Sequence, residues 1–194
     1  TQAPPSVSYR DVRFKMENPE LFFYRPPPYS ILTDESFFRV EHTVTLLQDL
    51  YRNFMNVFGP LVNTSDRGEG IQVLFFTRED AFKKYQEQLA PNMSGSSGFY
   101  SQEIDRLIVF NQRASGRMAL LRREVNLKYE RFVAEHPQPE AREGAERWRE
   151  ATEKEVAAWA EEQTQSTIRH EGAHQLFFTM GVHSAFGAEG EWLM

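Results

Sequence analysis

The sequence predicts an α+β fold, in which a small mixed sheet that includes a hairpin packs against long helices. Several stretches place apolar residues at spacings of three and four, as amphipathic helices do. Between them lie short runs rich in β-branched and aromatic residues, which are typical of buried strands. The 194 residues are enough for one domain with a sizeable core. We expect an extended arm over residues 1–35 and one domain over residues 36–194, with a charged helical insertion at about 137–163.

The first 35 residues are rich in proline and aromatic side chains. Pro26-Pro27-Pro28 sets an extended segment, so we expect an arm that packs on the domain. A helix is predicted from about Ser36 to Phe58, and Gly59-Pro60 ends it. Its apolar stripe consists of Val40, Val44, Leu47, Tyr51, Phe54 and Phe58.

The predicted strands lie in the middle of the chain. Residues Ile71–Phe76 indicate a buried strand, and a short helix follows from Arg78 to Leu89. A loop from Met93 to Gly98 leads into Phe99-Tyr100, and Leu107–Phe110 follows after a polar turn. These last two segments predict a hairpin.

The rest of the chain is predicted to be helical. One helix runs from about Gly116 to Glu135 and is broken at His136-Pro137-Gln138-Pro139. A charged helix with alternating Glu and Arg follows from Glu140 to Glu162, and such a charge run indicates a solvated face. A final helix is expected from near Thr164 to Gly181, where the glycine serves as the C-cap.

Composition excludes several classes of function. With 40% hydrophobic and 26% charged residues the chain has the balance of a water-soluble globular protein, and no apolar run approaches the roughly 18 residues of a membrane-spanning helix. A net charge of -6 disfavours nucleic acid as the partner. Cysteine is absent, so any metal must be held by histidine and carboxylate. The start at Thr1-Gln2-Ala3-Pro4-Pro5 resembles either a chain whose leader was removed, which favours an extracytoplasmic or secreted location, or a chain that begins inside a longer protein.

The final predicted helix carries the residues with a recognisable chemistry. His170 and His174 lie one turn apart on the same face, so both imidazoles can reach one metal ion at about 2.0–2.1 Å. Glu171 lies about 100° further round the helix, where it can act as general base beside the metal. The small residues Gly172 and Ala173 allow another element to pack closely here. The alternative is a chance spacing with no metal.

A catalytic zinc site usually needs a third protein ligand. The position six residues after His174 is Met180, which disfavours the three-histidine pattern of the metzincins. Three roles stay open for His183, which follows the predicted helix: a metal ligand, a hydrogen-bond donor to the transition state, or a surface residue. Glu189 and Glu191 are the remaining carboxylates within reach.

The His-Glu-x-x-His pattern resembles that of the gluzincins, the thermolysin-like clan of zinc peptidases. More narrowly, about residues 40–194 are similar to a bacterial group of peptidase-like domains with this active-site helix. The matching segments are Gly98-Phe99-Tyr100, His170 to Leu176, Gly181-Val182-His183 and Trp192-Leu193.

The resemblance implies a zincin-like fold with Zn²⁺ held by His170 and His174, and with Glu171 as the base. It implies a glutamate as third ligand soon after Trp192-Leu193, one residue beyond Met194, with Glu191 as the other candidate. It also implies that an edge strand near Tyr100 pairs with an extended peptide. Tyr100 and His183 are therefore candidate substrate-binding residues, although Tyr100 also fits a packing aromatic in a strand.

Three hypotheses follow. The first is a zinc metallopeptidase that acts on a peptide or protein substrate. The second is a peptidase-like binding or scaffold domain without hydrolytic activity. The third is a structural protein whose charged helices bind a partner. The substrate and the oligomeric state stay open.

Overall fold

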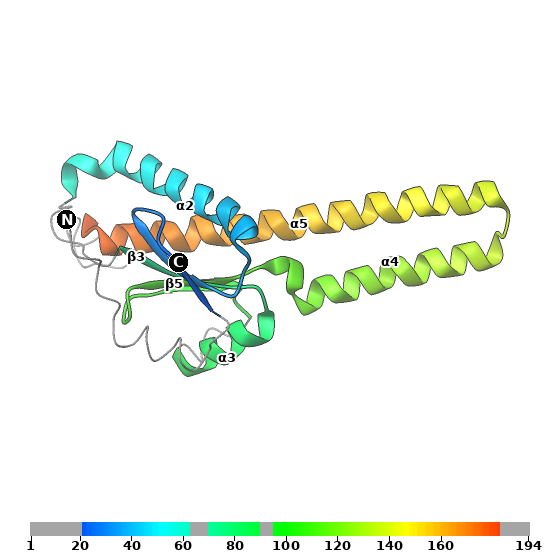
Figure 1. Cartoon of the computed structure of the whole chain (residues 1–194), viewed down its shortest axis with the longest axis horizontal. Coiled ribbons are helices and arrows are strands. Elements are labelled where there is room, and N and C mark those ends of the chain that lie inside the picture. Colours follow the sequence, from blue (N-terminus) through cyan, green and yellow to red (C-terminus); the bar gives the residue numbers. More distant parts are fainter. Residues whose placement is uncertain (1–20, 63–69, 90–94, 183–194) are drawn as a thin grey trace.

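The computed structural model describes residues 21–62, 70–89 and 95–182 (Figure 1). These ranges contain a five-stranded mixed sheet and four α-helices, which confirms the predicted α+β class. Among them, no helix is both long and apolar enough to cross a membrane.

The three central strands of the sheet run parallel, and an antiparallel strand flanks them on each side. All five residues of the central strands β2 and β5 are buried, because helices cover both faces of the sheet. The strand order is β1 (Phe22–Tyr24), β2 (Tyr29–Thr33), β3 (Ile71–Phe76), β5 (Arg106–Phe110) and β4 (Gly98–Ser101), so β4 is an edge strand.

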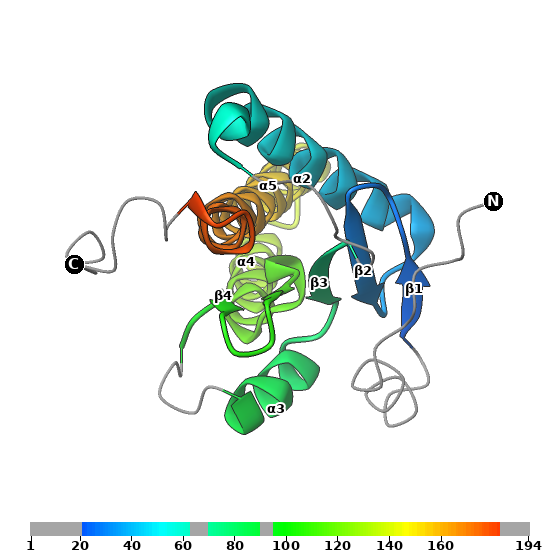
Figure 2. The same ribbon diagram turned by 90° about the vertical axis from the view of Figure 1, so that its left-hand side faces the viewer.

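Helices form a layer on each side of the sheet. Figure 2 shows α2 (Phe37–Phe58) and α5 (Pro139–Thr179) on one side and α3 (Glu79–Leu89) on the other. Because side chains alternate along a strand, Val73 enters the core beneath α2 and α5, whereas Leu74 enters the core against α3. The α5 layer is the one that carries the two histidines.

The helix α4 (Gly116–Glu135) and the N-terminal half of α5 form a long antiparallel pair that projects from the sheet (Figure 1). The Ser115 hydroxyl caps α4 by accepting from the Met118 amide at 3.3 Å. The guanidinium of Arg149 lies 4.5 Å from the ring centre of Tyr129 across the pair. The pair thus extends α5 well beyond the sheet.

Most predicted elements are present. The helices expected at 36–58, 78–89 and 116–135, the strand at 71–76 and the hairpin near 99–110 correspond to α2, α3, α4, β3 and β4–β5.

Two expectations need correction. The segment predicted as an arm contributes β1 and β2 to the sheet, and its residues 1–20 lie outside the described ranges. The prediction of two separate helices at 140–162 and 164–181 is wrong, because α5 is one continuous helix of 41 residues. Neither glycine nor proline occurs near residue 163, and the helical hydrogen bonding continues through it.

Candidate functional site

His170 and His174 lie on adjacent turns of α5 and direct their rings toward one another. Their Nε2 atoms are 3.2 Å apart, and the ring centres are 4.7 Å apart with the planes at 84°. The side chain of His170 is exposed and that of His174 is half-buried.

This pair can be tested for its fit to a zinc ion. Two nitrogens held at about 2.0–2.1 Å by one tetrahedral ion lie about 3.3–3.4 Å apart. The observed 3.2 Å separation is close to that value, so the spacing of the two nitrogens suits one tetrahedral ion. The same distance also fits a hydrogen bond in which one imidazole donates and the other accepts.

The described residues contain no cluster of three His, Asp or Glu side chains placed to hold a metal ion. The candidates His183, Glu189 and Glu191, and the Trp192-Leu193 segment, lie outside the described residues. Met180, at the position where a metzincin would have its third histidine, is buried at the end of α5.

Glu171 is held beside the edge strand β4. Its Oε2 accepts a hydrogen bond from the backbone amide of Tyr100 at 3.1 Å, and its Oε1 has no partner among the described residues. The carboxylate is half-buried, and the strand fixes one of its two oxygens.

The Tyr100 side chain makes a second set of contacts. Its ring stacks on Phe178 with 5.8 Å between ring centres, and its hydroxyl donates to Asp105 Oδ1 at 2.8 Å. Thr179 donates to the same oxygen at 2.6 Å. The prediction named Tyr100 for its side chain, but it is the backbone that meets Glu171.

Sequence reasoning missed Asp105. It lies in the turn between β4 and β5 with a φ of 47°, a left-handed conformation that aspartate tolerates better than most residues. By accepting from Tyr100 and Thr179 it joins the hairpin to the end of α5. Only the polar character of the turn signals it in the sequence. Tyr100 is five residues away in the same hairpin, but Thr179 is distant along the chain.

Two glycines allow α5 to approach its neighbours. A Cβ added at Gly172 would lie 2.8 Å from Leu50 Cδ2 on α2, which agrees with the predicted close packing at this position. A Cβ added at Gly98 on β4 would lie 2.7 Å from Thr167 Cγ2 on α5. The Ser97 and Thr167 hydroxyls are hydrogen-bonded at 2.9 Å beside it. The edge strand therefore lies directly against the helix that carries the histidines.

No protein-family model, curated protein or solved structure matches this chain. Function therefore has to follow from the chemistry of the α5–β4 site.

Proposed function

We propose that this protein is a zinc-dependent metallopeptidase with a zincin-like site on α5. The observation that supports it is the combination of two Nε2 atoms 3.2 Å apart with a glutamate that the edge strand holds next to them. His170 and His174 would hold the ion through Nε2, and the third ligand would come from Glu191 or from a glutamate after Met194. Bound zinc would supply a Lewis acid that activates water and polarises the substrate carbonyl.

Glu171 would carry the proton in this reaction. Since Oε2 already accepts the Tyr100 amide, Oε1 is the oxygen that would take a proton from the attacking water and return it to the leaving amine. The Tyr100 contact restricts rotation of this carboxylate. Fixing the base in this way lowers the entropy that has to be lost on reaching the transition state.

The substrate proposed here is an extended peptide that lies along β4. An edge strand can recognise a peptide main chain through its outer hydrogen-bonding groups, and β4 is the outermost strand next to α5. Because the Tyr100 amide of this strand already donates to Glu171, a peptide that pairs with other groups of β4 would have its backbone close to this carboxylate.

The test is zinc content followed by proteolysis. Elemental analysis of the purified chain, and of a form extended past Met194, should give close to one zinc per chain. His174→Ala should lose the zinc, whereas His136→Ala, an exposed histidine far along the α4–α5 pair, should keep it. Glu171→Gln should keep the zinc and lose cleavage of fluorescein-labelled casein by at least about 100-fold. Wild-type protein that takes up no zinc would refute the proposal.

The second candidate is a peptidase-like binding domain that hydrolyses nothing. The 3.2 Å separation of the two Nε2 atoms also fits a direct hydrogen bond between the imidazoles, and this arrangement needs no metal ion. Such a domain would bind peptides along β4 whether or not zinc is present. Peptide binding that persists in His174→Ala, without cleavage by the wild type, would select this candidate.

A further inference from the structure

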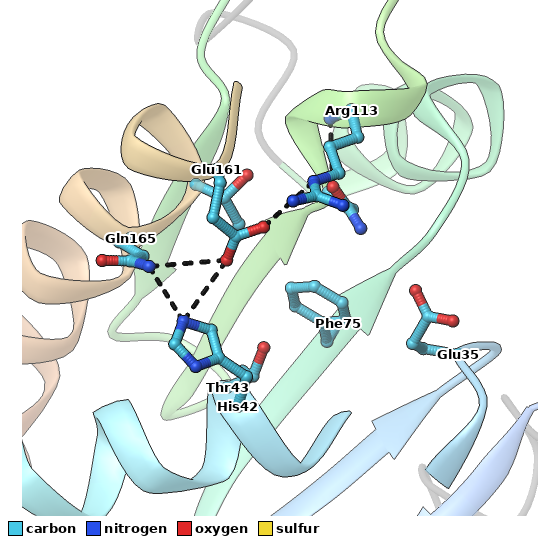
Figure 3. A pocket seen from close by; sticks show the side chains of 9 residues that line it. Glu35, His42, Thr43, Phe75, Arg113, Glu161 and Gln165 are labelled. Atoms are coloured by element: carbon cyan, nitrogen blue, oxygen red, sulfur yellow. Dashed lines mark hydrogen bonds and ion pairs between the residues drawn. The ribbon is translucent and has the colours of Figure 1, made fainter. Parts of the chain in front are cut away.

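A cavity of about 430 Å³ lies between α2 and α5 at the carboxyl ends of the parallel strands (Figure 3). Glu35, Phe75 and Asn111 line it from the ends of β2, β3 and β5. In open α/β sheets, ligands bind in the crevice outside these strand ends. The volume is that of a site for a small molecule.

One wall of the cavity is held together by Glu161 of α5. Its Oε2 pairs with Arg113 Nε at 3.2 Å, and its Oε1 lies 3.4 Å from Nε2 of His42 on α2. Figure 3 shows these side chains converging on one side, with Gln165 bonded to the same histidine. The charge of Glu161 is therefore balanced within the protein by Arg113.

Glu35 faces Glu161 across the cavity (Figure 3) and has no such balance. The residue is only 6% exposed. Its Oε1 accepts from the amide and hydroxyl of Ser36 at 2.9 and 3.4 Å, and its Oε2 has no partner among the described residues. No cationic side chain described in the structure lies within ion-pair distance of it. The adjacent N-terminus of α2 stabilises this carboxylate in part, but burial without a charged partner among the described side chains is still costly, so its retention needs a reason.

The described side chains that line the cavity thus carry one excess negative charge when His42 is neutral, and Phe75, which is 2% exposed, forms part of the lining. Ammonium groups bind to buried carboxylates and to aromatic faces. A bare metal ion is a poorer fit, because no three carboxylate or histidine side chains of the described residues are arranged to hold one.

We propose that this cavity binds a compact organic cation through its protonated amine, with Glu35 as the counter-charge. The ammonium can belong to a free small molecule or to the amino terminus of a peptide, since both present the same group. The inference does not depend on zinc or on peptidase activity, because none of the lining residues belongs to the His170–His174 site.

The test follows the ring signals of His42 by NMR while amines are added. The probes are butylammonium and the peptide Gly-Gly-Leu, each compared with its N-acetyl derivative, which has no positive charge. Saturable shifts with the amines and none with the acetylated forms are expected. Glu35→Gln should weaken binding at least ten-fold, whereas Glu162→Gln, an exposed residue of α5 outside the cavity, should leave it unchanged.

The relative affinity of the two amines identifies the source of the ammonium. Tighter binding of Gly-Gly-Leu indicates a peptide terminus, and tighter binding of butylammonium indicates a free amine.

The melting temperature gives an independent readout. If Glu35 serves a ligand, then Glu35→Gln should melt at the same temperature as wild type or higher, because Gln can still accept from Ser36. A lower melting temperature for this variant, equal binding by it, or no saturable shift with either amine would overturn the proposal. Glu35→Asp, which withdraws the carboxylate by one methylene, should bind with intermediate affinity.

Discussion

Alanine at Gly98 should destabilise the protein, because β4 and α5 are too close there to accept a methyl group. The added Cβ would lie 2.6 Å from Val109 Cγ1, 2.7 Å from Thr167 Cγ2 and 3.0 Å from the Ile108 carbonyl oxygen. Non-bonded carbon atoms settle at about 3.5–4.0 Å, so the strand has to move outward by up to about 1 Å. Such overpacking costs about 1–3 kcal/mol. In a chain of 194 residues this corresponds to about 2–4 °C of melting temperature per kcal/mol.

The matched control is the same substitution at Gly144 in α5, where an added Cβ meets nothing within 4 Å. Because alanine favours the helix, Gly144→Ala should stabilise the protein by about 0.5–1 kcal/mol. Thr167→Ser in the Gly98→Ala background removes the clashing methyl, keeps the hydroxyl that meets Ser97, and should restore part of the loss. Urea denaturation measures all four proteins. The reasoning fails if Gly98→Ala stays within about 0.3 kcal/mol of wild type, or if both alanines shift stability in the same direction.

Burial, with a smaller contribution from Tyr51, raises the pKa of Tyr29 well above its ordinary value of 10.0. The unfolded chain therefore loses the Tyr29 proton at a lower pH than the folded protein, and the free energy of unfolding should fall as the pH rises above 10. Tyr29→Phe removes this titrating group and also a buried hydroxyl that has no partner among the described residues. In thermal melts the variant should be about 1 kcal/mol more stable than wild type at pH 7, and its stability should fall less between pH 7 and pH 11. Hydrogen bonds from Lys83 and the Gly116 amide lower the pKa of Glu79 from its ordinary value of about 4.5. The ionised Glu79 side chain therefore stabilises the fold above pH 4.5, and this stabilisation is lost as the pH falls through the lowered pKa. Glu79→Gln should therefore cost about 0.5–1 kcal/mol at pH 7 and much less near pH 3 by urea denaturation, and an equal loss at both values would contradict this. If zinc binds as proposed, adding it at 100 times its Kd should stabilise the wild type by about 2.7 kcal/mol and leave the melting temperature of His174→Ala unchanged.

The elements that could be predicted from the sequence are those whose signal is local. The helix α2 shows its apolar stripe, and β3 is an uninterrupted apolar run. The strands β1 and β2 were missed because prolines surround them and because β1 has only three residues. The strand β2 pairs with β3, residues 71–76, which is distant along the chain, and β1 in turn pairs with β2.

The same division applies to the candidate site. The relation between His170 and His174 is a property of one helix, so the spacing alone predicts that their rings meet. The contact of Glu171 with Tyr100, and of Thr179 with Asp105, depends on how the hairpin packs on α5. Glu35 gave no signal at all, because it lines its cavity only after three strands and two helices have assembled around it.

The unbroken course of α5 limits how the length of this protein can change. The helix spans about 60 Å and joins the tip of the α4–α5 pair to the histidines without a joint. One inserted residue in its outer half would rotate everything beyond the insertion by about 100° about the helix axis and would separate α5 from α4. Insertions of about seven residues, made in α4 and α5 together, are tolerable because seven residues are close to two full turns. The same faces of the two helices then still contact one another. Related chains should therefore differ in the reach of this projection by whole pairs of turns, while the spacing around His170 and Glu171 stays fixed.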